Sequence, residues 1–418
     1  MTTPGIPATT PDTPAPEQDD LLADARGLLP GIVAVRRTLH RAPELGLHLP
    51  RTQRTVLDAL EGLPLAISKG KGLTSVTAVL DGARPGRTIL LRADMDALPQ
   101  HEDTGLEFSS EVPGAMHACG HDAHTAMLVG AARLLAARRE RLAGRVVFMF
   151  QPGEESGGGA RHMIDEGVLG DEPAAVDGAF ALHISSRQDS GTLGLRPGPA
   201  LASADLVRLT VHGGGGHASA PHLALDPIPV ACEIVQALQT MITRTVSVFD
   251  PAVLTITRIQ AGTTTNIIPE TAELLGTLRT LTPDTRSTVR GRIARLAEHI
   301  AAAHGATVDI DLTEGYPPLV NDAGFTTLAT ETATALLGAE RVHHVADPVM
   351  GAEDFSYVLE RVPGTMAFLG ARPPGRTPEQ TPDLHSNRVV FDEDALATGA
   401  AVHAAVAQAF FAQSGHPK

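Results

Sequence analysis

The order of strands and helices between residues 204 and 315 constrains the fold more than any other feature of the sequence. Apolar or alternating runs predict strands at 204–213, 252–262, 271–281 and 306–315, and amphipathic runs predict helices at 226–244 and 286–305. The resulting order, β-α-β-β-α-β, is the ferredoxin-like pattern. We therefore expect residues 201–313 to form a small α+β domain.

The segments on both sides of this block alternate between strand and helix. Strands are expected within 75–80, 87–99, 144–155 and 176–186, the last of them ending at His183; helices are expected at 20–43, 51–63, 124–140 and 159–169, and α/β-like segments resume at 326–338 and 364–370. Such alternation is typical of an α/β domain with a largely parallel sheet. We predict that residues 23–200 and 314–418 form this larger domain, with 201–313 inserted into it. Residues 1–22 include a Pro- and Thr-rich tail that we expect to be disordered.

Charge and cysteine usage exclude several classes of partner and compartment. The formal charge is −15 at pH 7, so nucleic acid and anionic membranes, which need clustered Lys and Arg, are not expected partners. Two cysteines in 418 residues favour a reducing compartment. The N-terminus lacks the basic and apolar regions of a signal peptide, and we read no membrane span. These features predict a cytoplasmic location.

The segment HACGHDAHTAM, residues 117–127, concentrates three histidines, one cysteine and one aspartate. Cys119 and His121 could face a common metal ion, and the helix that follows would favour an anionic thiolate. Cys119 could instead be a nucleophile beside a histidine base. The segment could also be only a polar entry to an apolar helix, and by itself it does not separate these alternatives.

Other polar residues fall where the apolar strands are expected to end. Asp94 and Asp96 follow one strand, Glu154 and Glu155 another, and His183 a third. Open α/β sheets bind ligands at the carboxyl ends of their strands, so these side chains could converge on one crevice. Taken singly, paired glutamates in a turn or a lone histidine are more often solvated or structural. Together, Cys119, His121, Glu155, His183 and His385 would supply enough ligands for two divalent ions.

The predicted inserted domain carries its own polar candidates. His217 lies in the glycine-rich segment GGGGHASAPH, residues 213–222, which does not fit a phosphate-binding loop. It could donate to a substrate oxygen, or it could be an incidental histidine in a hairpin. Asn266 follows TTT at a turn, and Arg279 on a strand could grip a carboxylate in a bidentate manner.

The combined motifs resemble one family. LRADMDALP, MHACGHDAHTAM, QPGEES, ALHIS, GGGGHASAPH, TTTNIIP, GTLRT, MGAEDFSY and DLHS occur in the order found in the amidohydrolase branch of the aminoacylase/carboxypeptidase metallopeptidases, which includes hippurate and auxin-conjugate hydrolases. The resemblance covers residues 30–410. It implies an α/β catalytic domain of the zinc-exopeptidase type with an inserted ferredoxin-like lid that dimerises, so we expect a homodimer or a higher oligomer.

The resemblance also implies a role for each matching residue. The metal ligands would be Cys119, His121, Glu155, His183 and His385, holding two ions that could be zinc, manganese, cobalt or nickel. Glu154 would be the general base, and Asp96 would support the metal centre from behind the ligands. His217 would reach the neighbouring subunit's site, while Asn266 and Arg279 would bind substrate. His117, His124 and His222 receive no role.

We therefore expect metal-assisted hydrolysis of the amide bond of small N-acyl amino acids. A dipeptidase or carboxypeptidase of the same fold is the enzymatic alternative. A non-catalytic metal-dependent binding protein is a second alternative, although it would not need the spare carboxylate of Glu154. A cysteine hydrolase that uses Cys119 is a third.

Overall fold

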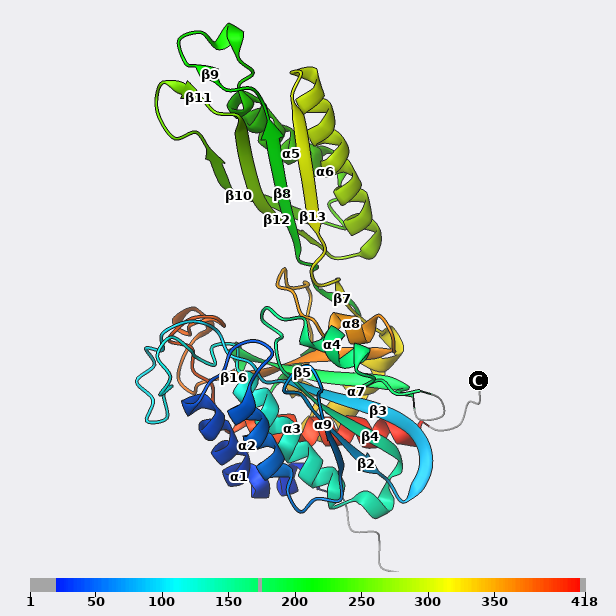
Figure 1. The fold of residues 1–418 in the computed structure, drawn as a ribbon. Coiled ribbons are helices and arrows are strands. Elements are labelled where there is room, and N and C mark those ends of the chain that lie inside the picture. The colour runs from blue at the N-terminus through cyan, green and yellow to red at the C-terminus, as the bar shows by residue number, and fades with distance from the viewer. Residues whose placement is uncertain (1–19, 172–174, 414–418) are drawn as a thin grey trace, which may run out of the picture.

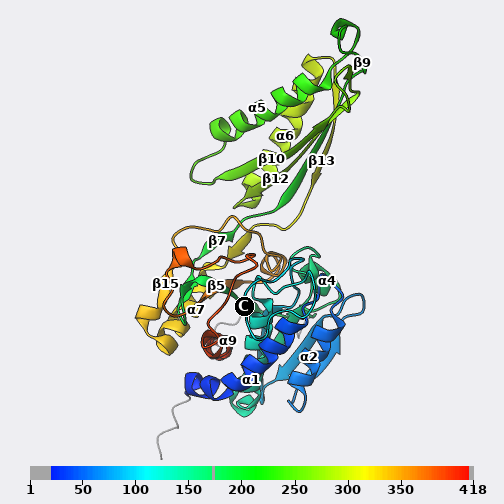
Figure 2. The ribbon, with the colours of Figure 1, turned by 90° about the vertical axis from the view of Figure 1, so that its left-hand side faces the viewer.

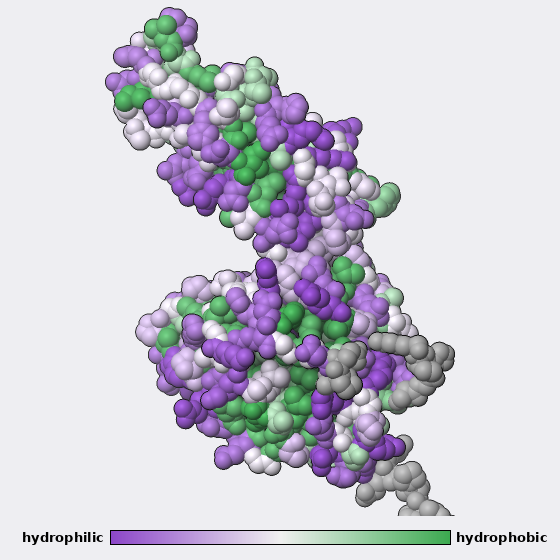
Figure 3. Space-filling view, turned by 45° about the vertical axis from the view of Figure 1, so that its right-hand side comes forward, coloured by the Kyte–Doolittle hydropathy of each residue, from purple (hydrophilic) through white to green (hydrophobic). Residues whose placement is uncertain are grey.

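The computed structural model describes residues 20–171 and 175–413, which form two parts stacked one above the other (Figure 1). The larger part is built around one sheet, and the smaller part is a separate sheet with two helices. Figure 3 shows that the two parts meet at a narrow neck. The predicted N-terminal tail falls almost wholly outside the described residues, although its last two residues already belong to the first helix.

The larger part contains an eight-stranded mixed sheet in the order β1-β2-β4-β3-β5-β16-β6-β15. Its strands are β1 (Ala66–Lys69), β2 (Val76–Asp81), β3 (Arg84–Asp94), β4 (Ala143–Gln151), β5 (Gly178–Asp189), β6 (Leu193–Leu195), β15 (Val342–His344) and β16 (Gly364–Arg372). The four central strands, β4, β3, β5 and β16, run parallel to one another. Their carboxyl ends therefore share one edge of the sheet.

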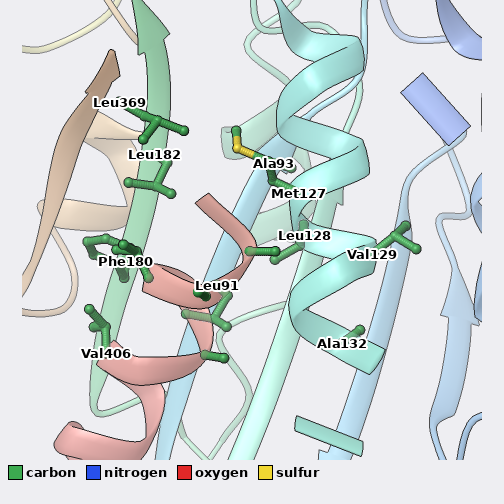
Figure 4. Close-up of a cluster of buried hydrophobic side chains, with 14 of the residues drawn as sticks. Leu91, Ala93, Met127, Leu128, Val129, Ala132, Phe180, Leu182, Leu369 and Val406 are labelled. Carbon is green, nitrogen blue, oxygen red and sulfur yellow. The ribbon is translucent and has the colours of Figure 1, made fainter. Parts of the chain in front are cut away.

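Helices cover both faces of this sheet. They are α1 (Leu21–Arg41), α2 (Pro50–Leu60), α3 (His121–Ala136), α4 (Gly159–Asp165), α7 (Ala323–Leu337), α8 (Ser356–Leu359) and α9 (Ala395–Ala412). Figure 4 shows one face, where Met127 and Leu128 of α3 and Val406 of α9 meet Phe180 and Leu182 of β5. The opposite face packs against α4 and α8.

Helix α9 is long and apolar enough to span a membrane, by length and composition alone, which the sequence reading did not anticipate. Most of it, 83% of the apolar window, is buried inside the protein. The helix packs against α1, α3 and α7, so its apolar surface belongs to the core of the larger part. The location of the protein remains a prediction.

The smaller part has the topology predicted for residues 204–315. Its strands are β8 (Asp205–His212), β10 (Ala252–Ala261), β12 (Thr271–Thr280) and β13 (Thr307–Thr313), and its helices are α5 (Pro227–Thr245) and α6 (Pro283–Ala303). The sheet order β10-β12-β8-β13, with every pair antiparallel, is that of a ferredoxin-like fold. Both helices lie on one face of the sheet (Figure 2), over a core of buried aliphatic side chains.

Short strands finish the connections between and beyond the two parts. β7 (Gly198–Leu201) pairs with β14 (Leu319–Asn321) in the larger part, while β9 (Gly216–His217) pairs with β11 (Ile267–Ile268) at the far end of the smaller part (Figure 1). The chain crosses between the parts twice, at residues 202–204 and at residues 314–318. Two connecting segments that lie side by side therefore join the smaller part to the larger part.

Two local expectations differ from the structure. Helix α3 begins at His121 and not at His124, because Gly120 takes a left-handed conformation (φ 85°) that starts the helix directly after it. Strand β5 does not end at His183 but continues to Asp189, since its register with β16 extends past that histidine. His183 therefore lies within a strand.

Candidate active site

A cavity of about 710 Å³ lies between the carboxyl edge of the sheet and the connection to the smaller part. Of the predicted site residues, its lining includes Cys119, Glu154, Glu155, His183, His385 and Arg279. His121 lies next to this lining, because its ring nitrogen is within 4.8 Å of ligand atoms of both Cys119 and Glu155. The structure thus brings together all five predicted metal ligands with the predicted base.

The loop that carries Cys119 and His121 is fixed by a glycine and a backbone carbonyl. A Cβ atom on Gly120 would lie 2.4 Å from Ile184 Cγ2, and the residue has a positive φ, so only glycine fits without displacement. His121 Nδ1 donates to the Asp96 carbonyl oxygen at 2.9 Å. This hydrogen bond leaves His121 Nε2 buried and without a hydrogen-bond partner among the described residues, 3.5 Å from Asp94 Oδ2 and 3.9 Å from Glu155 Oε1.

His183 is oriented in the same way from strand β5. Its Nδ1 donates to the Ile184 carbonyl oxygen at 2.8 Å, and its Nε2 lies 3.5 Å from Cys119 Sγ. Burial lowers the pKa of His183 to about 3, so the imidazole is neutral and Nε2 carries a lone pair. Burial also raises the pKa of the Cys119 thiol to about 12, whereas a cysteine nucleophile needs a lowered pKa.

The turn after β4 holds two glutamates whose backbone is fixed by Asp96. Asp96 Oδ1 accepts the Glu154 N–H at 2.9 Å, and Asp96 Oδ2 accepts the Glu155 N–H at 3.1 Å. Through its carbonyl oxygen the same aspartate also orients His121. Asp96 therefore aligns one predicted ligand and the turn that carries another, as expected of a residue that supports a metal centre from behind its ligands.

Glu155 and His385 complete the group of predicted ligands on its exposed side. Glu155 Oε1 lies 3.3 Å from His385 Nε2 and 3.9 Å from His121 Nε2. His385 is the one non-glycine residue with positive φ (65°) among the described residues. Its N–H donates to the Ala118 carbonyl oxygen at 2.9 Å, which ties it to the loop of Cys119. A strained backbone at this position fits a functional requirement.

These donors fit a pair of divalent cations. The groups Cys119–His121–His183 and Cys119–Glu155–His385 each bring three ligand atoms within 4.8 Å of one another. His121 Nε2 is buried and lacks a hydrogen-bond partner among the described residues, which is costly unless a cation binds it. Imidazole, carboxylate and thiolate suit borderline transition metals such as zinc.

A second set of buried charges surrounds Glu154. Its carboxylate lies within 4.8 Å of those of Glu353 and Asp354, and all three are buried. Arg92 donates to Glu353 at 2.7 Å and to Asp354 at 3.0 Å. Burial, and then the charges of Glu353 and Asp354, raise the pKa of Glu154 above its ordinary value.

Sequence reasoning assigned no role to Arg92, Glu353 or Asp354. Two of them stand in the segment MGAEDFSY, and Arg92 stands in LRADMDALP, so each motif contained the signal. A buried arginine on a central strand needs carboxylate partners. The sequence pattern does not identify these partners, because Glu353 and Asp354 lie more than 250 residues from Arg92.

The structure also shows the surroundings of His124 and His117, two histidines to which no role was assigned from the sequence. His124 Nδ1 donates to Asp94 Oδ1 at 2.6 Å, and its Nε2 accepts the Ile184 N–H at 2.8 Å. Both nitrogens are used in these hydrogen bonds, through which His124 braces the loop against β3 and β5. His117 is buried, and neither of its ring nitrogens has a partner among the described residues.

The three candidates of the smaller part do not lie together. Arg279 on β12 lines the cavity, is half-buried, and makes no side-chain hydrogen bond with the described residues. His217 and Asn266 lie on β9 and beside β11 at the far end of that part, and both are exposed (Figure 1). They are neighbours, since the Ala218 N–H donates to the Asn266 carbonyl oxygen, but they do not line the cavity of their own chain.

Comparison with known sequences places this geometry in context. A sequence profile of Peptidase family M20/M25/M40 matches residues 90–409. Thermostable carboxypeptidase 1 of Saccharolobus solfataricus is 40% identical over 396 residues, covering 94% of this chain and 98% of that protein. N-acetylcysteine deacetylase of Bacillus subtilis is 39% identical over 366 residues, covering 87% of this chain and 93% of that protein.

A solved structure shares the whole architecture. The Bacillus subtilis YXEP protein, described as a dinuclear metal-binding peptidase, superposes with a TM-score of 0.81 at 36% sequence identity. The match covers 93% of this chain and 99% of that one. The two-part arrangement described above is therefore found in a protein that binds a metal pair.

Proposed function

The chain belongs to Peptidase family M20/M25/M40 and is a hydrolase of amide bonds, and from this premise we propose that it releases amino acids from small N-acyl amino acids. The observation that carries the proposal is a buried carboxylate, Glu154, in the same turn as the candidate ligand Glu155. A hydrolase of this type needs one carboxylate to hold metal and another to move protons. Adjacent glutamates with different surroundings can meet both needs.

We propose that Cys119, His121, Glu155, His183 and His385 hold two divalent cations. When bound, such ions supply Lewis acidity, which lowers the pKa of water and polarises a carbonyl group. The backbone carbonyls that fix His121 and His183 set both imidazoles in the tautomer that offers Nε2. The identity of the metal remains a prediction, with zinc, manganese, cobalt and nickel all compatible with these donors.

Glu154 would move the proton. Its carboxylate accepts a proton from the attacking water, and then delivers it to the nitrogen of the departing amino acid. A raised pKa suits both halves of this task, because the protonated acid must persist long enough to donate. Glu353 and Asp354, held by Arg92, would keep that pKa high.

We propose that the amino-acid half and the acyl half of the substrate bind at different ends of the cavity. Arg279 lies unpaired at the end next to the smaller part, where it could bind the carboxylate of the amino acid. The other walls include Leu201, Val345, Phe368 and Leu384, an apolar set suited to the acyl group. At about 710 Å³, the cavity has room for an acyl group larger than acetyl.

We further propose that the protein works as a homodimer joined through the smaller part. In this arrangement His217 would complete the site of the neighbouring subunit, where it would stabilise the oxyanion. The position of His217 supports this proposal, since it is exposed and far from the cavity of its own chain. Asn266, which lies beside it, would contact the same substrate.

One assay series tests the proposed function. The purified protein, reconstituted in turn with zinc, manganese, cobalt and nickel, is given acetyl-, hexanoyl- and benzoyl-amino acids, and unblocked dipeptides as the comparison. We expect hydrolysis of the acylated substrates, strongest for the larger acyl groups, and reversible loss of activity with a chelator. Hydrolysis of dipeptides alone would overturn the substrate assignment.

A carboxypeptidase is the second candidate, because relatives with 40% and 39% identity bear that name. The two activities differ in the group on the carbonyl side of the scissile amide bond. In a carboxypeptidase substrate this group is a peptide, and in an N-acyl amino acid it is a simple acyl group. An N-blocked dipeptide distinguishes the two, since only a carboxypeptidase prefers it over the corresponding N-acyl amino acid. Activity that resists chelation but is lost on thiol alkylation would instead indicate a cysteine hydrolase.

A further inference from the structure

Tyr316 occupies the second connection between the two parts, and its side chain reaches the wall of the cavity. Its ring packs edge-on against that of Tyr357, with 6.0 Å between the ring centroids. Tyr316 lies outside the sequence motifs quoted above. The proposed mechanism gives it no task either.

The hydroxyl of Tyr316 makes two hydrogen bonds, both with the turn that carries the glutamates. It donates to the Glu154 carbonyl oxygen at 2.5 Å and accepts the Gly158 N–H at 3.2 Å. The carbonyl of Glu154 belongs to the peptide group that joins Glu154 to Glu155. One phenol therefore fixes the plane between the proposed base and a proposed metal ligand.

The backbone of Tyr316 is joined to the other connection. Its carbonyl oxygen accepts the Ala204 N–H at 3.0 Å. Ser203, the preceding residue, exchanges backbone and side-chain hydrogen bonds with Thr280 at 2.7 to 3.0 Å. Thr280 directly follows Arg279, the proposed binder of the substrate carboxylate.

The residue before Tyr316 is tied to the smaller part as well. Gly315 accepts a hydrogen bond from Arg286 of α6 through its carbonyl oxygen at 3.0 Å, and its N–H donates to Asp205 at 3.2 Å. Hydrogen bonds, joined by peptide links between adjacent residues, thus connect Thr280, next to Arg279, and α6 through both connections to the carbonyl oxygen of Glu154. A movement of the smaller part would be transmitted to the turn through the single hydroxyl of Tyr316.

We propose that Tyr316 is a positioning residue that couples the capture of the substrate carboxylate at Arg279 to the placement of the Glu154 backbone. The inference rests on the proposed function, because it takes Glu154 as the base and Arg279 as the carboxylate binder. Connections between domains commonly absorb the movement that assembles a catalytic site. Displacing a proton-transfer group by a fraction of an ångström lowers the rate of the chemical step without weakening substrate binding.

The first test compares the two tyrosines of the chain. Tyr316→Phe removes the hydroxyl and keeps the ring, while Tyr357→Phe is the matched control, because its hydroxyl bonds Gly315 and not Glu154. With N-hexanoylglycine we expect Tyr316→Phe to lower kcat about tenfold, with KM within about twofold. Tyr357→Phe should stay within about twofold of wild type in both constants. Equal behaviour of the two variants would overturn the role of Tyr316.

A second substrate separates coupling from a general structural defect. N-hexanoylglycinamide has no carboxylate, so it cannot form the proposed ion pair with Arg279 that is coupled to Glu154. We expect the kcat difference between wild type and Tyr316→Phe to shrink to about twofold with the amide. An undiminished tenfold difference would mean that Tyr316 supports the turn without coupling, and would overturn the proposal.

A binding measurement covers the case in which Tyr316→Phe does not fold. The sequence has two tyrosines and no tryptophan, so in a Glu154→Gln/Tyr357→Phe protein all tyrosine emission comes from Tyr316. N-hexanoylglycine should change this emission on binding, and N-hexanoylglycinamide should not. No change with either ligand, at concentrations where calorimetry shows binding, would overturn the coupling.

The failure of this inference and the failure of the proposed function have different signatures. If wild-type protein leaves every N-acyl amino acid intact, or if Glu154→Gln keeps full activity, the proposed function fails. If those experiments succeed while Tyr316→Phe behaves like Tyr357→Phe, only the role of Tyr316 fails.

Discussion

The candidate functional residues of the larger part and those of the smaller part differ in burial and in hydrogen bonding. In the larger part His121, His183 and Glu154 are buried, and each donates a hydrogen bond to a fixed oxygen: His121 and the Glu154 N–H to Asp96, and His183 to the Ile184 carbonyl. In the smaller part His217 and Asn266 are exposed at its far end. Between these extremes, Arg279 is half-buried and unpaired at the cavity.

This difference reflects how exactly each side chain must be positioned before the substrate binds. A metal ligand must be held within a few tenths of an ångström, so its hydrogen-bond partners are built into the same domain. A residue that meets the substrate only after assembly or closure can be left exposed until then. Substitutions in the larger part should therefore change the chemical step, and those in the smaller part should depend on assembly and on the substrate carboxylate.

The largest expected effect separates the two adjacent glutamates. Glu154→Gln should retain both metal ions and lose about a thousandfold in kcat, because the amide cannot accept the proton from water. Glu155→Gln is the matched control and should lose metal, measured by elemental analysis of the dialysed protein. Near-wild-type activity of Glu154→Gln would remove the distinction between base and ligand.

The next effect tests whether the smaller part acts on its own subunit or on a neighbour. His217→Ala should lower kcat about a hundredfold, since one oxyanion donor is lost. Mixing it with Glu154→Gln protein under conditions of subunit exchange should restore about a quarter of wild-type activity, because mixed dimers contain one intact site. Absence of restoration, with exchange verified by mass spectrometry, would place the action of His217 within one chain.

A smaller effect is expected at Arg279. Arg279→Met should lower kcat/KM about thirtyfold for an N-acyl amino acid and leave the corresponding amide substrate nearly unchanged, because only the carboxylate is recognised. Arg258→Met, on the neighbouring strand β10 and outside the cavity lining, is the matched control. Equal losses with both substrates would mean that Arg279 does not read the carboxylate.

The smallest effect concerns stability and not catalysis. His40 is buried between Asp122 and Glu102, with Nδ1 2.8 Å from Asp122 and Nε2 3.2 Å from Glu102. Burial opposes protonation, but the Asp122 charge prevails and, with Glu102 and against Arg36, raises the pKa of His40 to about 9. The stabilisation is complete below pH 6.5, the ordinary value, and is lost as the pH rises through 9.

Denaturant unfolding at several pH values checks this prediction. The free energy of unfolding should fall by up to about 3 kcal/mol between pH 6.5 and 9 in the wild type. The fall should be much smaller in His40→Gln, which has no imidazole to titrate. The same substitution at the exposed His222 serves as the control and should keep the wild-type slope. A wild-type slope in His40→Gln would exclude this network as its source.

Much of the architecture followed from periodicity. The β-α-β-β-α-β order appears in the structure with the ferredoxin-like strand order, and the α/β class with its zinc-exopeptidase fold is confirmed. The resemblance to the amidohydrolase branch is confirmed as well. These features survive in one dimension because each depends on local patterns or on short motifs in a fixed order.

The errors arose where tertiary contacts overrode a local signal. The end of β5 was predicted at His183, but pairing with β16 carries the strand on to Asp189. The start of α3 was predicted three residues late, because the left-handed Gly120 was not recognised as the helix boundary. Both errors moved a predicted ligand relative to its element, although His121 and His183 still lie within 4.8 Å of other predicted ligands.

The sequence by itself determined the fold class and the family, and it predicted a set of candidate metal ligands and a candidate base, since these depend on composition, periodicity and motifs. Only the tertiary structure decided which of these residues meet. It assigned His124 to a hydrogen-bond brace, placed Glu353 and Asp354 beside Glu154, and joined Tyr316 to the turn. Burial, and the partners it forces on a polar group, arise from contacts between segments far apart in the chain, which a linear pattern does not record.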